Sequence, residues 1–260
     1  MTWDLALGCV TVGLVIATLT TPVGVSGAVF LLPVQFSLLG VPSPAVTPTN
    51  LLFNVVAAPG GLLRFRRRGG LASPLTRVLL LGTLPGVVIG AVIRVFAVPS
   101  ADVFQLVAAA VLLPLGVWLW VGTLRSAPPR PRSAPSNRAI ATLSVGVGVV
   151  GGIYGIGGGS ILGPILVGRG LPVVTVAPAA LASTFLTSVT GALTFAVLEM
   201  TGRGDIAPDW PVGLLCGLGG LAGGYLGAAL QPLLPERRLR QLLGTCAVAI
   251  GMLYVVQTVA

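Results

Sequence analysis

Long apolar stretches dominate the chain, and short polar turns separate them. The apolar segments cover residues 5–39, 49–63, 75–97, 103–124, 139–168, 175–198, 211–233 and 241–259. A stretch of about 20 apolar residues is long enough to cross the hydrocarbon core of a bilayer as an α-helix. The pattern therefore predicts an all-α polytopic membrane protein with tight connections between its spans.

Two of these apolar segments are interrupted by glycine. The stronger interruption is Gly155-Ile156-Gly157-Gly158-Gly159-Ser160, and a weaker copy is Gly24-Val25-Ser26-Gly27-Ala28. Each glycine weakens a helix by about 1 kcal/mol relative to alanine, so such a cluster breaks one. Open backbone at membrane depth is tolerated only where it is buried in protein or lines a cavity. Two broken helices at matching places in two halves of a chain are typical of a transporter's binding site.

The two halves of the chain repeat the same order of features. Gly24, Gly27, Leu31 and Pro33 correspond to Gly155, Gly158, Leu162 and Pro164, and Gly82, Gly86 and Gly90 to Gly219, Gly223 and Gly227. We therefore predict two homologous repeats, residues 1–124 and 139–260, joined by a polar, proline-rich linker at 125–138. Each repeat contains a glycine-broken segment followed by three transmembrane helices.

The orientation of the repeats depends on whether the broken segment crosses the membrane or re-enters as a hairpin. Full crossing gives parallel repeats, and re-entry gives inverted ones. Cytoplasmic loops are rich in arginine. The inverted arrangement puts every arginine except Arg94 and Arg203 on the cytoplasmic side, whereas the parallel one strands Arg237, Arg238 and Arg240 outside. The charges favour inverted repeats with both termini outside.

Composition narrows the function. The chain of 260 residues is 55% hydrophobic and only 8% charged, against about 25% charged residues in soluble domains. All basic residues are arginine, and most lie in short loops, so the net charge of +9 reflects topology signals and not a nucleic-acid-binding face. Cys9, Cys216 and Cys246 lie in apolar segments without paired spacing and are interpreted as small packing residues.

Missing residue types exclude several chemistries. The chain has no histidine, which excludes a serine–histidine protease and a histidine metal site. No carboxylate cluster suits a divalent metal within the membrane. No ionisable residue is placed deep in a span, because Glu199 and Arg94 lie near span ends. We expect no enzyme activity, no metal and no cofactor.

The glycine breaks suggest an anion site made of neutral groups. Helices that start within the bilayer present free N–H groups and a positive dipole end, which bind anions without a charged side chain. Hydroxyl and amide groups in the breaks and in the following span would complete the pocket. The predicted substrate-binding residues are Gly24, Ser26, Gly27, Thr49, Asn50, Asn54, Gly155, Gly157, Gly158, Gly159, Ser160, Ser183, Thr184 and Thr187.

The alternative to a binding site is helix packing. Small residues allow close approach of membrane helices, and polar ones form interhelical hydrogen bonds. Packing is the better interpretation for Gly82, Gly86 and Gly90 and their counterparts, whose four-residue spacing follows one helix face. The density of glycine at 155–159 exceeds what packing needs, which favours a site there. For Asn54 an interhelical hydrogen bond and a cavity-facing role stay equally open.

The motif Gly-x-Gly-Gly-Gly-x4-Pro-x-Leu, from Gly155 to Leu166, resembles that of the TauE/SafE family of sulfite-exporter-like membrane proteins. The turns Pro48-Thr49-Asn50-Leu51 and Pro178-Ala179-Ala180-Leu181 and the basic loop Arg64–Arg68 are also similar to the family pattern. The chain departs from it at Ser26 and Ala28, where glycines are usual, and at Ala179-Ala180, which replace Thr-Ser. These departures leave open a substrate other than sulfite.

The resemblance implies a multi-pass permease of the bacterial inner membrane that exports small anions such as sulfite or organosulfonates. We expect a secondary transporter that works by alternating access, because the chain has no ATPase motif. The alternative is an uncoupled anion channel or a permease for another small solute. The expected partners are membrane lipids and a small anionic substrate, with no nucleic acid, and a homo-oligomer stays open. The residues do not identify the exact substrate, the direction of transport or the coupling ion.

Overall fold

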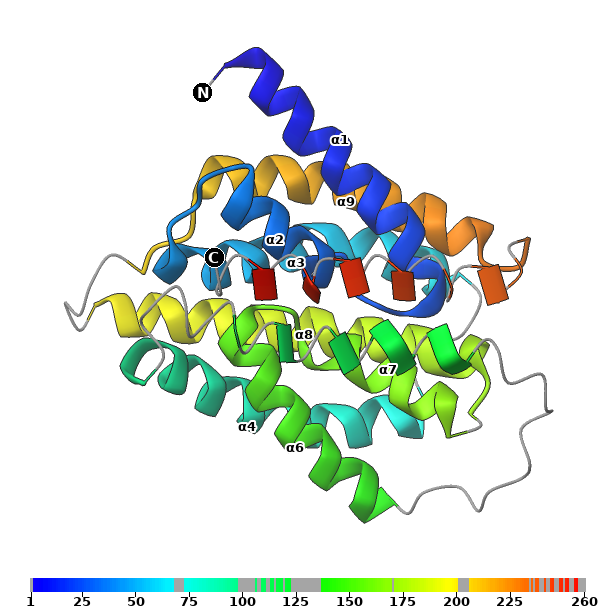
Figure 1. The fold of residues 1–260 in the computed structure, drawn as a ribbon. Helices are drawn as coiled ribbons and strands as arrows, with labels where there is room; N and C mark the ends of the chain where they lie inside the picture. Colours follow the sequence, from blue (N-terminus) through cyan, green and yellow to red (C-terminus); the bar gives the residue numbers. More distant parts are fainter. Residues whose placement is uncertain are drawn as a thin grey trace.

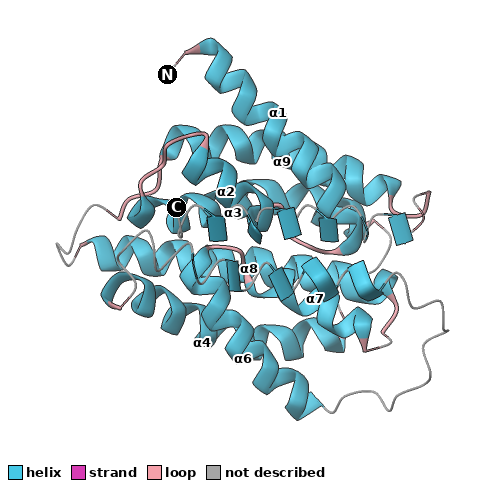
Figure 2. Cartoon of the chain, in the orientation of Figure 1, coloured by secondary structure: helices cyan, strands magenta, loops and turns pink. Residues whose placement is uncertain are grey.

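A computed structural model describes residues 2–67, 73–97, 137–169, 171–200 and 206–233, with isolated residues between 106 and 122 and between 235 and 256. Helices make up nearly all of this described part, and no strand occurs in it (Figure 1; Figure 2). The elements are α1 (Trp3–Thr20), the short 3-10 helix η1 (Thr21–Val23), α2 (Ala28–Ser37), α3 (Ser43–Arg66), α4 (Pro74–Phe96), α6 (Asn137–Tyr154), α7 (Gly158–Gly168), α8 (Val173–Glu199) and α9 (Trp210–Leu230). The expected all-helical fold is confirmed.

Within the described residues, 5 helices are long and apolar enough to cross a membrane. They are Trp3–Val23, Ala45–Arg66, Pro74–Phe96, Val173–Glu199 and Trp210–Leu230, each within or close to a predicted apolar segment. Two shorter apolar helices, α6 and α7, divide the segment 139–168 between them. The spans expected at 103–124 and 241–259 lie largely outside the described residues. So does the linker at 125–138, except for its last two residues, which begin α6.

Glycine allows the long helices to pack backbone against backbone. On α4, a Cβ added to Gly86 would lie 2.4 Å from the Val145 carbonyl oxygen of α6. On α9, a Cβ at Gly219 would lie 1.9 Å from the carbonyl oxygen of Val10 in α1. Atoms cannot approach this closely, so only glycine fits at these crossings. The packing role predicted for the regularly spaced glycines is confirmed.

Neighbouring contacts give the direction of each helix. Along α4 and α6, Gly82 meets Ala141 and Gly90 meets Val149, so the two helices run parallel. In the same way α1 and α3 run parallel to α9, and α4 runs parallel to α8. The central pair is antiparallel, because Gly61 of α3 faces Leu181 of α8 whereas the earlier Leu51 faces the later Gly191. Figure 1 shows the resulting arrangement, in which α1, α3 and α9 run one way and α4, α6 and α8 run the other.

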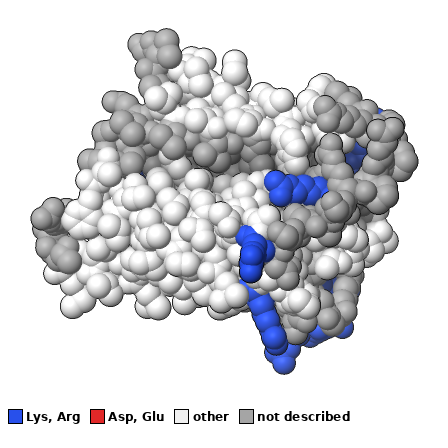
Figure 3. Space-filling model, turned by 90° about the horizontal axis from the view of Figure 1, so that it is seen from below, with Lys and Arg blue, Asp and Glu red and all other residues white. Residues whose placement is uncertain are grey.

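These directions gather the arginines at one end of the helical body. The basic end is formed by the end of α3, the starts of α4 and α6, and the end of α7, and it carries Arg64, Arg66, Arg67, Arg77, Arg138 and Arg169. Figure 3 shows basic side chains concentrated at one end of the face in view. The acids among the described residues lie at the opposite end of the helical body, Asp4 and Asp209 at the starts of α1 and α9 and Glu199 at the end of α8. We call the arginine-bearing side the basic end below.

The glycine-rich interruptions are helix breaks in the structure. After α1 and η1, Gly24 has a φ of 74°, and α2 starts at Ala28. After α6, Gly155 and Gly157 have φ values of 69° and 70°, and α7 starts at Gly158. A side chain strongly disfavours this left-handed region of backbone conformation, whereas glycine adopts it readily. The sequence therefore determines where both helices end.

Candidate functional site

The two helix breaks meet in the interior although they lie far apart in sequence. The backbone N–H of Ser26 in the first break donates to Ser160 Oγ in the second at 3.2 Å, and both residues are buried. Ser26 Oγ accepts a hydrogen bond from the N–H of Ala28, the first residue of α2, at 3.1 Å. The structure thus brings together the two breaks that the sequence pattern paired.

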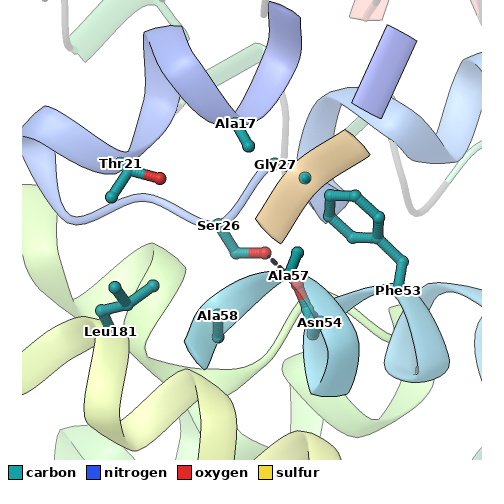
Figure 4. A pocket seen from close by; sticks show the side chains of 10 residues that line it. Ala17, Thr21, Ser26, Gly27, Phe53, Asn54, Ala57, Ala58 and Leu181 are labelled. Atoms are coloured by element: carbon teal, nitrogen blue, oxygen red, sulfur yellow. Dashed lines mark hydrogen bonds between the residues drawn. The ribbon is translucent and has the colours of Figure 1, made fainter. Parts of the chain in front are cut away.

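Asn54, in the middle of α3, joins both breaks. Its Oδ1 accepts a hydrogen bond from the Ser26 hydroxyl, and its Nδ2 donates to the Gly155 carbonyl oxygen at 3.2 Å. Figure 4 shows Ser26 and Asn54 pointing toward each other. The interhelical hydrogen bond that the sequence left as an alternative is therefore present. It also places the amide at the meeting point of the breaks.

Asn50 lies one turn earlier on α3 and contacts the ends of two helices. Its Nδ2 donates to the carbonyl oxygens of Ala28 at 3.2 Å and Tyr154 at 3.4 Å. Its Oδ1 is buried and has no hydrogen-bond partner within the described part of the chain. The side chain is fully buried. Asn50 thus carries an unsatisfied acceptor beside the second break.

Helix α8 supplies hydroxyls to the second break. Thr187 Oγ1 accepts from the N–H of Gly158, the first residue of α7, at 3.3 Å. Ser160 Oγ donates to the Ile156 carbonyl oxygen at 2.7 Å and lies 3.5 Å from Thr184 Oγ1. These side chains are fully buried. They surround the start of α7 with neutral donors and acceptors.

Two of the expected site residues are used elsewhere. Thr49 Oγ1 donates to Ala45 at 2.6 Å and accepts from the N–H of Asp209 at 2.8 Å, so it supports the start of α9 and does not face the breaks. Ser183 lies beside α4, where its hydroxyl is 3.0 Å from that of Thr83. Thr83 in turn packs its methyl group against Gly158. The Ser183 hydroxyl is therefore connected to the second break through Thr83 and does not contact the break itself in any described hydrogen bond.

The glycines of the site admit no side chain. A Cβ at Gly159 would lie 1.8 Å from the Ala180 carbonyl oxygen, and one at Gly24 would lie 2.5 Å from the Cα of Ala177. A Cβ at Gly27 would meet Ile16 at 2.9 Å. Both breaks are thus pressed closely against neighbouring helices.

The first backbone N–H groups of the two short helices remain available. Within the described residues, the N–H groups of Gly159 and Ser160 at the start of α7 have no hydrogen-bond partner. The same holds for Gly27 and Val29 at the start of α2. Such orphan donors are characteristic of helix N-termini and carry partial positive charge. The meeting breaks therefore present donors from two helix ends.

A small cavity borders the first break. It measures about 10 Å³ and is lined by Ala17, Thr21, Ser26, Gly27, Phe53, Asn54, Ala57, Ala58, Leu181 and Gly220 (Figure 4). This volume holds about one water molecule. An oxyanion of sulfur is larger than that, so the structure is closed around the breaks.

Arg94 is a buried charge that the sequence interpretation missed. It lies near the end of α4, as expected, but only 2% of its surface is exposed. Its Nη2 donates to the carbonyl oxygen of Ser43 and also to the Ser43 hydroxyl, the latter at 2.9 Å. Its Nε donates to Thr47 Oγ1 at 3.2 Å. Thr47 Oγ1 donates to the Ile153 carbonyl oxygen at 2.8 Å. Arg94 is thus linked to the end of α6 just before the second break.

A signal for Arg94 exists in the sequence. It is an arginine within an apolar segment, whereas most of the other arginines lie in turns and in the linker. Ser43 and Thr47 are four residues apart and share one helix face. The described residues include no group of three or more His, Cys, Asp or Glu side chains able to hold a metal ion. The groups described above at the breaks are neutral dipoles, and the Arg94 guanidinium is linked to the end of α6 through Thr47.

Comparison with protein families gives a match over almost the whole chain. The family model of the sulfite exporter TauE/SafE matches residues 9–254. The chain belongs to the TauE/SafE family. No match is found among curated proteins or among solved structures. TauE/SafE membership and the apolar helices together show a multi-pass membrane protein of a transporter family.

Proposed function

We propose that this TauE/SafE protein is a secondary transporter that exports a small anion, sulfite or an organosulfonate, across the bacterial inner membrane. Family membership supports the substrate class and the membrane location. The observation that carries the mechanism is the contact between Ser26 and Ser160, which joins two helix breaks beside the middle of α3 and α8. Alternating access would then move the anion past this contact.

The groups at the breaks suit an oxyanion. The free N–H groups at the starts of α2 and α7 aim partial positive charge at one region, and the Thr184 hydroxyl, 3.5 Å from Ser160 Oγ, adds a donor. Neutral donors bind an anion without holding it as tightly as a buried ion pair would. This balance suits a carrier, which must release its substrate on each cycle.

Inverted repeats are supported by the way in which the helices pack. Suppose that α1 corresponds to α6, α2 to α7, α3 to α8 and α4 to α9. Replacing each helix by its counterpart then turns every major packing pair into a pair that is also present in the structure. The pair α1–α9 becomes α4–α6, α3–α9 becomes α4–α8, α2–α3 becomes α7–α8, and α3–α8 remains itself. Exchanged helices also run in opposite directions, as inverted repeats require. We therefore assign residues 1–124 and 139–260 to two inverted repeats.

The basic end defines the proposed sidedness. Arginine-rich connections remain in the cytoplasm, so the ends of α3 and α7 and the starts of α4 and α6 are assigned to that side. The hairpin of α1 and α2 then re-enters from outside, and the hairpin of α6 and α7 re-enters from the cytoplasm. The contact between Ser26 and Ser160 brings the starts of α2 and α7 together, which supports a shared site.

Transport requires the closed state to open. The cavity beside Ser26 holds about one water molecule. The hydrogen bonds Ser26–Ser160 and Asn54–Gly155 span elements of both repeats, so relative motion of the repeats would break them and widen the site. Because the chain has no nucleotide-binding motif, we expect an ion gradient or the membrane potential to provide the energy.

Flux measurements in proteoliposomes test this proposal. Purified protein is reconstituted with sulfite on one side, and uptake is followed against sulfite concentration, with counterflow as a second readout. We expect saturable flux that Gly158→Leu abolishes, because a side chain there would meet Thr83 within 2.5 Å and displace the start of α7. Gly146→Leu is the matched control, since no described atom lies within 4 Å of a Cβ at Gly146 on α6.

Each other outcome has a definite meaning. Unsaturable sulfite flux would identify an uncoupled channel and overturn the carrier mechanism. Absence of flux for sulfite, taurine and other organosulfonates would overturn the substrate class. Ser160→Ala, which removes one hydroxyl without adding bulk, should lower the flux while leaving the amount of inserted protein unchanged, so that loss of folding is distinguished from loss of binding.

A further inference from the structure

Two arginines and a tyrosine form a cluster at the basic end of α3 and α9. The guanidinium carbon of Arg64 lies 5.8 Å from the centre of the Tyr225 ring. Arg67 Nη1 donates a hydrogen bond to the Tyr225 hydroxyl at 3.3 Å. Tyr225 thus holds two guanidinium groups close to each other, and we call these three residues the Arg64–Tyr225–Arg67 cluster.

The cluster has spare hydrogen-bonding capacity. The Arg64 guanidinium lies within cation–π distance of the Tyr225 ring, and its planar edge carries several N–H donors. Arg64 Nε is buried and has no hydrogen-bond partner within the described residues. A planar guanidinium matches two oxygens of an oxyanion, and such charge-assisted bonds are roughly twice as strong as neutral ones. The cluster therefore suits a sulfonate, sulfite or phosphate group.

One face of α3 connects this cluster to the helix breaks. Asn54, Ala57, Gly61 and Arg64 follow one another at spacings of three or four residues, so they share a face of the helix. Between the amide and the guanidinium this face carries only small residues. The distance along the helix is about 15 Å, from ten residues at about 1.5 Å each. The same face lines the small cavity at Asn54, Ala57 and Ala58.

Gly61 lies on α3 between the cavity and the cluster, at a closely packed point. A Cβ at Gly61 would lie 2.7 Å from the Leu181 side chain and 2.8 Å from the methyl group of Thr21. Thr21 and Leu181 also line the cavity. Gln231 Nε2 donates to the Pro22 carbonyl oxygen at 2.7 Å and ties η1 to the end of α9. Thr21, Gly61 and Leu181 therefore close the way between the breaks and the basic end.

We infer that the Arg64–Tyr225–Arg67 cluster is a docking site for the transported oxyanion on the arginine-rich side of the membrane. The anion binds there first and reaches the breaks along the small face of α3 when Thr21 and Leu181 separate. This inference rests on the proposed anion transport and adds to it a second, peripheral site. An arginine that only marked topology would need neither the aromatic support nor the connection to the cavity.

The test compares Arg64→Gln with Arg66→Gln in proteoliposomes. Both variants remove one positive charge from the same turn of α3, but Arg66 is exposed and has no contact with Tyr225. Sulfite presented to the basic end should show a KM raised about tenfold by Arg64→Gln, the size expected for one lost charge-assisted bond, with kcat little changed. Arg66→Gln should leave both constants near wild type. Tyr225→Leu should raise KM although every charge is kept.

Three results would overturn the inference. Equal KM values for the Arg64 and Arg66 variants would reduce the cluster to a topology signal while leaving the proposed transport intact, whereas wild-type protein without anion flux would contradict the proposed function itself. The lipid composition of the liposomes is varied in a second arm of the test. If the difference between the two variants appears in liposomes containing phosphatidylglycerol and disappears in pure phosphatidylcholine, the cluster binds a lipid phosphate and not the substrate.

Discussion

At the scale of single residues, Asn54 combines structural and chemical roles. An asparagine within an apolar span is costly unless its amide is satisfied. Here Oδ1 bonds to Ser26 and Nδ2 to Gly155, so each side of the amide contacts a different helix break. The residue therefore links breaks that belong to different halves of the chain.

Replacing Asn54 by alanine should weaken both the fold and transport. The change leaves the Gly155 carbonyl oxygen without its bond from Asn54, and we expect a loss of about 1–2 kcal/mol in stability. Thermal unfolding in detergent would show it as a lower Tm, together with reduced sulfite flux. Thr194→Ala is the control, because the hydrogen bond of that hydroxyl within the described residues goes to Thr190 of its own helix. An unchanged Tm for Asn54→Ala would contradict the linking role.

At the scale of elements, close backbone packing explains why so many glycines occur within helices. Glycine normally costs a helix about 1 kcal/mol against alanine. At the α4–α6 and α1–α9 crossings the missing Cβ lets one backbone rest on the carbonyl oxygens of another. Van der Waals attraction between the two backbones along the whole crossing offsets the lower helix propensity.

This account predicts opposite effects of one substitution at two sites. Gly86→Ala should destabilise the protein by about 1–3 kcal/mol, because its Cβ would collide with the Val145 carbonyl oxygen. Gly146→Ala should be neutral or stabilise by up to about 1 kcal/mol, since its Cβ meets no described atom within 4 Å. Unfolding in detergent measures both. The same sign for the two variants would argue against backbone packing at the α4–α6 crossing.

At the scale of the whole molecule, the exchange of packing pairs between the halves has a functional consequence. In transporters built from inverted repeats, alternating access is largely a rigid-body movement of one repeat against the other around the site. In the closed structure, the hydrogen bond between Ser26 and Ser160 joins both breaks. Opening toward one side or the other would then require similar movements of equivalent elements.

Cysteine labelling tests the sidedness. Cysteines are introduced at Trp3, Arg67 and Arg238 in turn, after Cys9, Cys216 and Cys246 have been replaced by alanine. We expect a membrane-impermeant maleimide to label Trp3→Cys in intact cells, and to label Arg67→Cys and Arg238→Cys only after permeabilisation, because arginine-rich ends remain in the cytoplasm. Labelling of Arg67 and Arg238 from opposite sides would contradict inverted repeats.

The sequence alone determined the helices and their breaks. Apolar segments of sufficient length become spanning helices in a bilayer whatever their neighbours, and Gly24, Gly155 and Gly157 end helices because they adopt positive φ. The positions of Ser26 and Ser160 at the breaks could be predicted for the same reason, since both residues belong to the glycine-rich interruptions. These features depend on local conformation and on burial in lipid, which are properties that a single segment possesses by itself.

Only the tertiary structure decided which way each side chain faces. Thr49 was expected at the breaks and lies at the start of α9, whereas Thr83 and Arg94 were missed and lie beside the second break. In water, a polar stripe reveals the outer face of a helix. In a membrane, lipid and protein core are both apolar, so the pattern hardly distinguishes them. Contacts of glycines that are far apart in sequence fix the rotation of each helix about its own axis. This rotation therefore determined which side chains lie at the site.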